Sequence, residues 1–227
     1  MTTSRKRQKK RLAVLMLGII LGASACLVPP FSDLQSAKLV GKGRVELTPH
    51  YSSITASGED GSDHIQDNFG IQAGVGVTKF MDFRMRYEFL HHPDSGDKHD
   101  ESYSGHVFGF GPKFSLIKDW LALFLPVGFA FGEDIEVSET WEFCPTVLFT
   151  IPVSQAFEIN TSAKSLIPYR KKQNTFYALN LGLGIGRDLR QWAFRPEIGI
   201  LFDSEGDKHY FHFSLGFTYK FGRKNAI

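Results

Sequence analysis

The 227-residue sequence is short of cysteines, of long apolar runs and, beyond its first residues, of positive charge. Two cysteines, Cys26 and Cys144, are too few and too far apart for a disulfide framework or a zinc site. No apolar run after residue 25 reaches the roughly 20 residues of a transmembrane helix. Without residues 1–25, which hold six basic and no acidic side chains, 20 basic and 24 acidic residues remain. Nucleic-acid binding is therefore not expected, and neither a metal nor another cofactor is expected.

The first 25 residues have the pattern of an export signal. Arg5 to Arg11 is basic, the next ten or so residues are apolar, and Ala23-Ser24-Ala25 supplies a small-x-small cleavage site. Cys26 follows directly. The run from Ala23 to Cys26 resembles the lipobox of bacterial lipoproteins, which implies that Cys26 is lipidated and becomes the mature N-terminus. Plain cleavage ahead of an unmodified Cys26 is the alternative.

From Arg44 onward, apolar and polar residues alternate with period two, which predicts strands with two unlike faces. The clearest example is the run from Phe83 to Phe89, in which every even position is charged. Ten strands are predicted, near residues 44–55, 65–80, 83–91, 103–116, 120–132, 138–151, 156–167, 175–187, 192–203 and 209–221. Tight turns alternate with longer polar loops, as in a closed antiparallel up-and-down barrel. An eight-stranded barrel with one hairpin folded elsewhere is the structural alternative.

The alternation alone does not show which face is outside, because a soluble calyx has the same pattern inverted. Glycines crowd the polar face, where a closed barrel needs room for large charged neighbours. The apolar face is rich in Phe and Leu, which would overfill a small interior. It also carries aromatic residues near strand ends, the pattern of a membrane girdle: Tyr87, Trp120, Trp141, Tyr177, Trp192 and Tyr219. A transmembrane barrel is therefore expected, with an exported soluble calyx that binds an apolar ligand as the alternative.

Residues 44–221 resemble the small outer-membrane β-barrel proteins of Gram-negative bacteria. The most specific part is the last strand, where Phe213, Leu215, Phe217, Tyr219 and Phe221 are similar to the C-terminal signal read by barrel-assembly machinery. The resemblance implies an outer-membrane location, with membrane lipids and that machinery as partners. Both termini are expected in the periplasm. Residues 26–43, which contain Pro29-Pro30 and no clear period, are expected to be a periplasmic tether, and residues 222–227 a C-terminal extension.

The inward face predicts a paired network of charges in the lumen, because unpaired ions in a low-dielectric interior are costly. Its members are Arg44, Glu46, Arg84, Arg86, Glu88, Lys113, Glu142, Glu158, Lys164, Arg187, Arg195, Glu197 and Lys220. A ten-stranded barrel is narrow, so these side chains should fill most of it. The expected function is therefore non-enzymatic: a scaffold, surface contact through the loops, or narrow passage of small solutes.

Two weaker patterns support an enzymatic alternative. His212-Phe213-Ser214 resembles the His and Ser of outer-membrane lipid A deacylases, although no acidic residue follows Ser214 and both side chains are predicted to point inward. The His- and Asp-rich run from His91 to Glu101 resembles the rim residues of omptin proteases, or a metal-binding loop. Polar filling of the lumen and a solvated loop are the favoured interpretations of these two patterns.

Five prolines within the predicted strands have no specific explanation at this level. Each removes one donor from the hydrogen-bond ladder, which in a membrane must be compensated by a bulge or a strand rim. They are Pro49, Pro112, Pro126, Pro145 and Pro196.

Overall fold

Antiparallel strands make up most of the chain that the computed structural model describes, namely residues 27–58, 61–93, 102–133, 135–170, 173–204 and 209–222. The strands are β1 (Val45–Gly58), β2 (Gly61–Gly76), β3 (Met81–His92), β4 (Tyr103–Ile117), β5 (Leu121–Phe124), β6 (Val127–Phe131), β7 (Glu142–Phe143), β8 (Thr146–Pro152), β9 (Phe157–Pro168), β10 (Phe176–Ile185), β11 (Trp192–Asp203) and β12 (His209–Phe221). One short 3₁₀ helix, η1 (Val137–Glu139), lies between β6 and β7. Among the described residues, no helix is long and apolar enough to cross a membrane.

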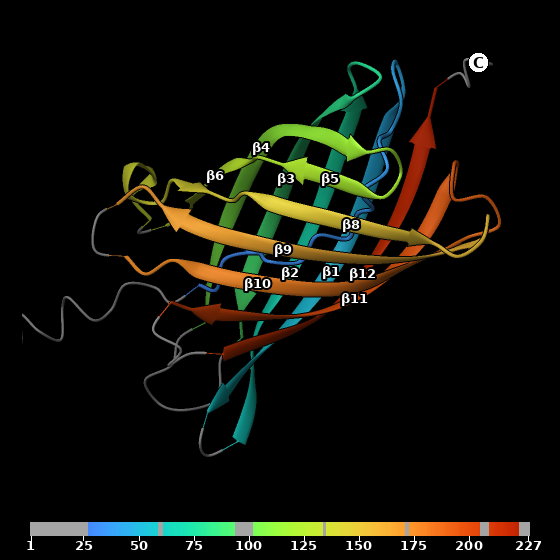
Figure 1. Cartoon of the computed structure of the whole chain (residues 1–227). Coiled ribbons are helices and arrows are strands. Elements are labelled where there is room, and N and C mark those ends of the chain that lie inside the picture. Colours follow the sequence, from blue (N-terminus) through green and yellow to red (C-terminus); the bar gives the residue numbers. More distant parts are fainter. Residues whose placement is uncertain are drawn as a thin grey trace, which may run out of the picture.

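The strands close into one barrel (Figure 1). Neighbouring strands of the wall pair antiparallel, and β12 returns to pair with β1, where Phe221 faces Val45. Two positions of the wall are each filled by two short strands. β5 and β6 both pair with β4, and β7 and β8 both pair with β9. The wall therefore has ten strand positions, which confirms the predicted ten-strand barrel and shows that the eight-strand alternative is wrong.

The two faces of the wall differ in the predicted sense. Large apolar side chains point outward, and Phe69, Leu179 and Ile198 are each more than half exposed. Lys113 and Glu88, from the alternate positions, are completely buried in the lumen. The soluble calyx is therefore wrong for this chain, because its interior would have to be apolar. An apolar outer surface around a polar interior is the arrangement of a membrane-spanning barrel.

Glycines on the inner face make room for the charged side chains. A Cβ added at Gly184 would lie 2.6 Å from Cγ of Glu158, and one at Gly70 would lie 2.6 Å from both His50 and Glu88. No side chain fits at these positions without displacing a buried neighbour. The interpretation of the inward glycines as space for large polar groups is therefore supported at both sites.

Three of the five prolines each lie opposite a residue of the neighbouring strand, and each such pair forms only one backbone hydrogen bond. Leu125 donates its N–H to the carbonyl of Pro112 (3.0 Å), Cys144 to that of Pro126 (2.9 Å), and Ser165 to that of Pro145 (3.1 Å). The proline in each pair has no N–H to return, so each pair keeps one bond of two. This accounts for the gaps between β5 and β6 and between β7 and β8, across which the pairing register is unchanged.

The barrel has a short-turn end and a long-loop end. Turns at residues 77–80, 118–120, 153–156 and 186–191 define the short-turn end, where β1 begins and β12 finishes. The connections after β3, β6, β9 and β11 define the long-loop end. β1 and β2 are also joined at this end, where they pair down to Gly58 and Gly61. Figure 1 shows η1 at this end of the barrel and the turn from β8 to β9 at the other.

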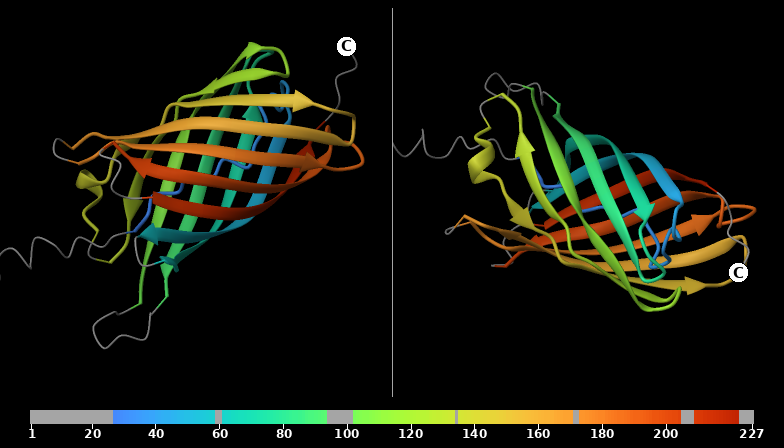
Figure 2. Two further views of the ribbon diagram at one scale, coloured as in Figure 1. Left: turned by 60° about the horizontal axis from the view of Figure 1, so that its bottom comes forward. Right: turned by 90° about the horizontal axis from the view of Figure 1, so that it is seen from above.

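Residues 27–43, termed the lumen segment, run through the inside of the barrel, as the blue trace in Figure 2 shows. Phe31, Leu34 and Ala37 are almost fully buried although the segment belongs to no strand. The prediction of a tether outside the barrel is therefore wrong for these residues. Their position could not be predicted from the sequence pattern, because the segment bonds to side chains of the wall and forms no strand with a recognisable period. Cys26 lies outside the described residues.

The two ends of the described chain lie at opposite ends of the barrel. Leu27 faces Gly105 and Ile135 at the long-loop end, whereas Phe221 pairs with Val45 at the short-turn end. At that end, Gly43 donates to the carbonyl of Gly76 (2.8 Å) where the lumen segment turns into β1. The expectation that both termini lie on the same side therefore does not hold for residues 27–222.

Candidate functional site: the occupied lumen

Nine of the thirteen predicted network residues are buried inside the barrel: Glu46, Arg84, Glu88, Lys113, Glu158, Lys164, Arg195, Glu197 and Lys220. Arg86 and Glu142 are half-buried on the same inner face. Two predicted members are not in the lumen. Arg187 is exposed, because β10 ends at Ile185 before it, and Arg44 precedes β1 and donates to the carbonyl of Arg190 at the rim (2.8 Å).

A cationic cluster lies near the short-turn end. Glu46 of β1 accepts a hydrogen bond from Arg84 (2.7 Å) and forms an ion pair with Lys220 (3.3 Å), so one carboxylate links three strands. Lys113 points into the same region and donates to the carbonyls of Ser36 (2.6 Å) and Lys38 (2.9 Å) in the lumen segment. The segment therefore supplies the acceptors that the wall leaves open for this ammonium group.

A second cluster surrounds the middle of the lumen segment. Asp33 lies 2.8 Å from Nζ of Lys164 and accepts hydrogen bonds from Ser162 and from Asn180 (2.9 Å). Glu158 pairs with Arg195 of the wall (3.1 Å) and with Lys38 of the segment (2.8 Å). Asp33 and Lys38 of the segment thus complete two ion clusters of the wall. Because the wall charges are buried, they depend on the segment for these partners.

Carboxylates of the wall also hold the backbone of the segment. The two oxygens of Glu197 accept the N–H groups of Asp33 and Leu34 at 2.7 Å each. Glu88 pairs with Arg86 and with His50 (2.8 Å), and Arg86 in turn donates to the carbonyl of Ser32 (2.6 Å). Backbone groups buried away from water need such partners, so these contacts fix the segment without a sheet.

The His212–Ser214 pair lies deep in this filling. Nδ1 of His212 is 2.6 Å from Oγ of Ser214, Nε2 is 3.0 Å from Asn180 Oδ1, and Oγ of Ser214 is also bonded to Ser52 (2.7 Å). The ring of Phe31 packs edge-on against His212 with centroids 4.6 Å apart. Both side chains point inward as predicted and are at most 4% exposed, so among the described residues they face packed protein and not lipid.

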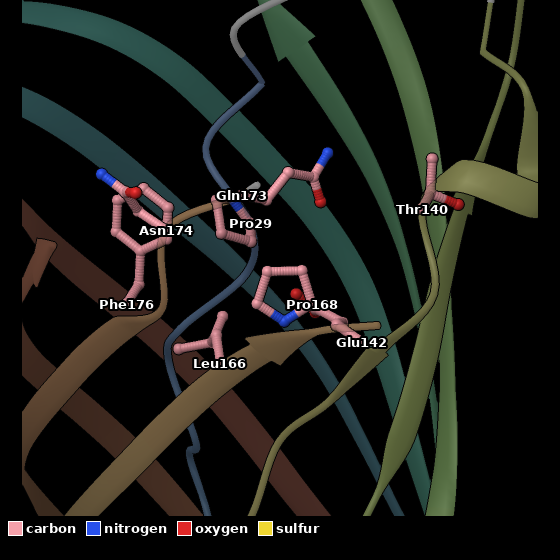
Figure 3. Close-up of a pocket in the computed structure, with 8 residues that line it drawn as sticks. All are labelled: Pro29, Thr140, Glu142, Leu166, Pro168, Gln173, Asn174 and Phe176. Carbon is pink, nitrogen blue, oxygen red and sulfur yellow. The ribbon is translucent and has the colours of Figure 1, made fainter. Parts of the chain in front are cut away.

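A pocket of about 430 Å³ opens at the long-loop end, beside the point where the lumen segment enters (Figure 3). Pro29 of the segment, Pro168 and Phe176 form apolar walls, and Glu142 and Gln173 supply polar groups. Cys144, on the same inner face as Glu142, is a buried free thiol. Leu166, which also lines this pocket, belongs with Phe31 to the hydrophobic cluster inside the barrel.

The His- and Asp-rich loop is described only at its beginning. His91 and His92 end β3, and the His92 ring stacks on Tyr103 with centroids 4.5 Å apart. The other residues of the predicted constellation, from Asp94 to Glu101, lie outside the described residues. The pairing of His92 with an aromatic ring on β4 shows a structural use for this histidine.

The predicted girdle residues lie on the outer face, and five of the six lie toward the ends of the barrel. Trp192 pairs across β11 and β12 with Tyr219 near the short turns, and Trp120 lies in the turn before β5. Trp141 and Tyr177 lie toward the long-loop end, whereas Tyr87 lies in the middle of β3. All six are half-buried or exposed. Tyr87 thus stands within the apolar belt, and the other five lie closer to its borders.

No family model matches the sequence, and no curated protein matches it. Solved structures with a similar fold include Ail, the attachment invasion locus protein of Yersinia pestis, which is 12% identical with a TM-score of 0.40 over 79% of this chain and 99% of that chain. OprG, an outer membrane protein from Pseudomonas aeruginosa, is 9% identical with a TM-score of 0.35 over 83% and 100% of the two chains. The outer membrane protease OmpT from Escherichia coli is 9% identical with a TM-score of 0.38 over 78% and 96%. Likeness at this level says nothing by itself about what this chain binds or does.

Proposed function

We propose that this chain is an integral outer-membrane β-barrel whose lumen is closed by its own residues 27–43, and that it acts without catalysis as a membrane scaffold that presents its long-loop end for contact. The observation that carries this proposal is the occupied lumen. Phe31 and Leu34 of the segment are at most 2% exposed, and the wall charges around them are paired with the segment. A path for solutes would need these pairs to separate, so narrow passage is not favoured.

Membrane insertion is supported by the outer face. Apolar side chains cover it from β1 to β12, and five of the six girdle residues lie toward its borders. The outward row of β12, including Phe213, Phe217 and Phe221, is exposed. This exposure supports contact with membrane lipids and recognition by barrel-assembly machinery as parts of the proposal. Export by the leader and lipidation of Cys26 are parts of the same proposal and rest on the sequence pattern.

The absence of catalysis is proposed from the surroundings of the His212–Ser214 pair. Phe31 covers His212, and both groups are already hydrogen-bonded within the lumen. The alternative of a lipid A-modifying enzyme predicts that His212→Ala changes lipid A in cells that express the protein. We expect identical lipid A from cells with the wild-type chain, the variant and an empty vector, and a difference that requires His212 would establish the enzyme.

Conductance in planar lipid bilayers tests the closed lumen. The folded wild-type chain, identified by altered gel mobility before boiling, should insert without a steady ionic current. A chain that lacks residues 28–40 should conduct, because it loses the segment that fills the lumen. A steady current through the wild-type chain would overturn the proposal, whether or not the shortened chain folds.

A further inference from the structure

The lumen segment crosses the whole height of the barrel. Near the long-loop end, Gln66 bonds both backbone groups of Val28: it accepts the N–H (2.9 Å) and donates to the carbonyl (2.9 Å). Near the short-turn end, Asp82 accepts the N–H of Val40 (2.7 Å). The residues between them contain neither helix nor hairpin, so the polypeptide passes once from one end to the other.

The wall holds this polypeptide mainly by its backbone. In addition to Gln66 and Asp82, the side chains that bond backbone groups of the segment are Asn180, Lys164, Arg86, Glu197, Gln72, Thr150 and Lys113. Side-chain donors bond the carbonyls of the segment, and carboxylate, amide and hydroxyl oxygens accept its N–H groups. These bonds satisfy backbone groups that would be orphaned inside a barrel. The inner surface is therefore a binding site for an extended polypeptide.

Two side-chain pairs set the register of the segment along this surface. Asp33 is bound by Lys164 at 2.8 Å, and Lys38 by Glu158 at 2.8 Å. Because the two wall residues lie on β9 six residues apart, and their partners in the segment are five apart, a shift of the segment along the barrel would break both pairs. The position of Leu27 at the long-loop end is thus fixed by charge as well as by backbone bonds.

We propose that the barrel carries its own N-terminal segment across the membrane and displays Leu27, with whatever is joined to it, at the long-loop side. Chain connectivity requires this, since β1 begins at the short-turn end and the segment leads away from it through the lumen. With the long loops at the cell surface, as the proposed function implies, the mature N-terminus is a surface group. An acyl group on Cys26 then inserts in the outer leaflet, and not in the periplasmic leaflet that a tether would reach.

Cysteine labelling in intact cells tests the display. Single cysteines are introduced at the two ends of the segment, Leu27→Cys and Lys42→Cys, in a chain that keeps Cys26, whose acylated sulfur does not react with maleimide, and buried Cys144. The parent chain without an added cysteine gives the background labelling. Ser204→Cys after β11 and Arg190→Cys in a short turn mark the two sides of the barrel. A polymer-linked maleimide too large to cross the outer membrane is added before or after permeabilisation, and gel mobility before boiling confirms that each variant is folded.

We expect Leu27→Cys and Ser204→Cys to react in intact cells, and Lys42→Cys and Arg190→Cys to react only after permeabilisation. Reaction of Leu27→Cys only after permeabilisation, with Ser204→Cys reactive before it, would overturn the display and leave the proposed barrel intact. Reaction of Arg190→Cys but not Ser204→Cys in intact cells would overturn the orientation, and the surface display with it. An epitope inserted between Cys26 and Leu27 and detected by antibody on intact cells gives a second measurement if Leu27→Cys does not fold.

Discussion

The inner and outer faces of the barrel wall are built from alternate residues of the same strands, but they differ in how much each residue is specified. Glu46 has two named cationic partners on two other strands, and Glu197 receives two particular N–H groups of the lumen segment. On the outer face, Val45 and Leu181 need only be apolar, because lipid has no directional requirement. The comparison teaches that particular residues are required on the inner face, whereas on the outer face only apolar character is required.

Removal of one buried charge from the inner face should have the largest effect. Glu46→Gln leaves Arg84 and Lys220 buried without their carboxylate, and the loss of one partner from a buried pair costs about 3–5 kcal/mol. The free energy of unfolding in lipid vesicles, measured by urea titration with tryptophan fluorescence, reports it. The adjacent outward substitution Val45→Ala is the matched control and should cost about 1 kcal/mol. A larger loss for Val45→Ala than for Glu46→Gln would contradict the comparison.

A charge on the outer face should have the next largest effect. Leu181, in the middle of β10, is 48% exposed on the face assigned to lipid. Leu181→Arg should destabilise the barrel by about 2–4 kcal/mol in lipid vesicles, the cost of a cation near the bilayer midplane. Leu181→Phe, which keeps the position apolar, should change the free energy of unfolding by less than about 1 kcal/mol. Equal stability of the Arg and Phe variants would mean that this face does not meet lipid.

The strands and their faces could be predicted because each one carries its own alternation, as the run from Phe83 to Phe89 does. The lumen segment could not, because its fold depends on partners as distant in sequence as Glu197, and a segment without a period looks like a linker. The alternation of the wall gives no sign of it, since the carboxylate that pairs with Lys164 is Asp33 of the segment and not a residue of a strand. Arg187 was misplaced because alternation does not show where a strand ends.

The pair formed by Asp33 and Lys164 allows the coupling between segment and wall to be measured. Asp33→Asn and Lys164→Met should each destabilise the protein, and the double variant should be less destabilised than the sum of the two. We expect a coupling energy of about 1–3 kcal/mol, because the groups are buried and in contact. The same urea titration provides all three values. Additive losses would mean that the segment is not held by this pair and would weaken the contrast with the outer face.

The smallest effect is expected at the residue pairs of the wall in which a proline allows only one backbone hydrogen bond. Pro126 lies opposite Cys144 and accepts its N–H, but has no N–H to return, and the Cys144 carbonyl is bonded by Oγ1 of Thr146 at 2.9 Å. Pro126→Ala adds a donor that faces this carbonyl, so the pair could form its second bond. We expect a gain of at most about 1 kcal/mol in the free energy of unfolding, the net value of one such bond. A marked loss in the free energy of unfolding would show that the interruption between β5 and β6 is itself required. The backbone of this part of the wall would then be as strictly constrained as the charges of the lumen.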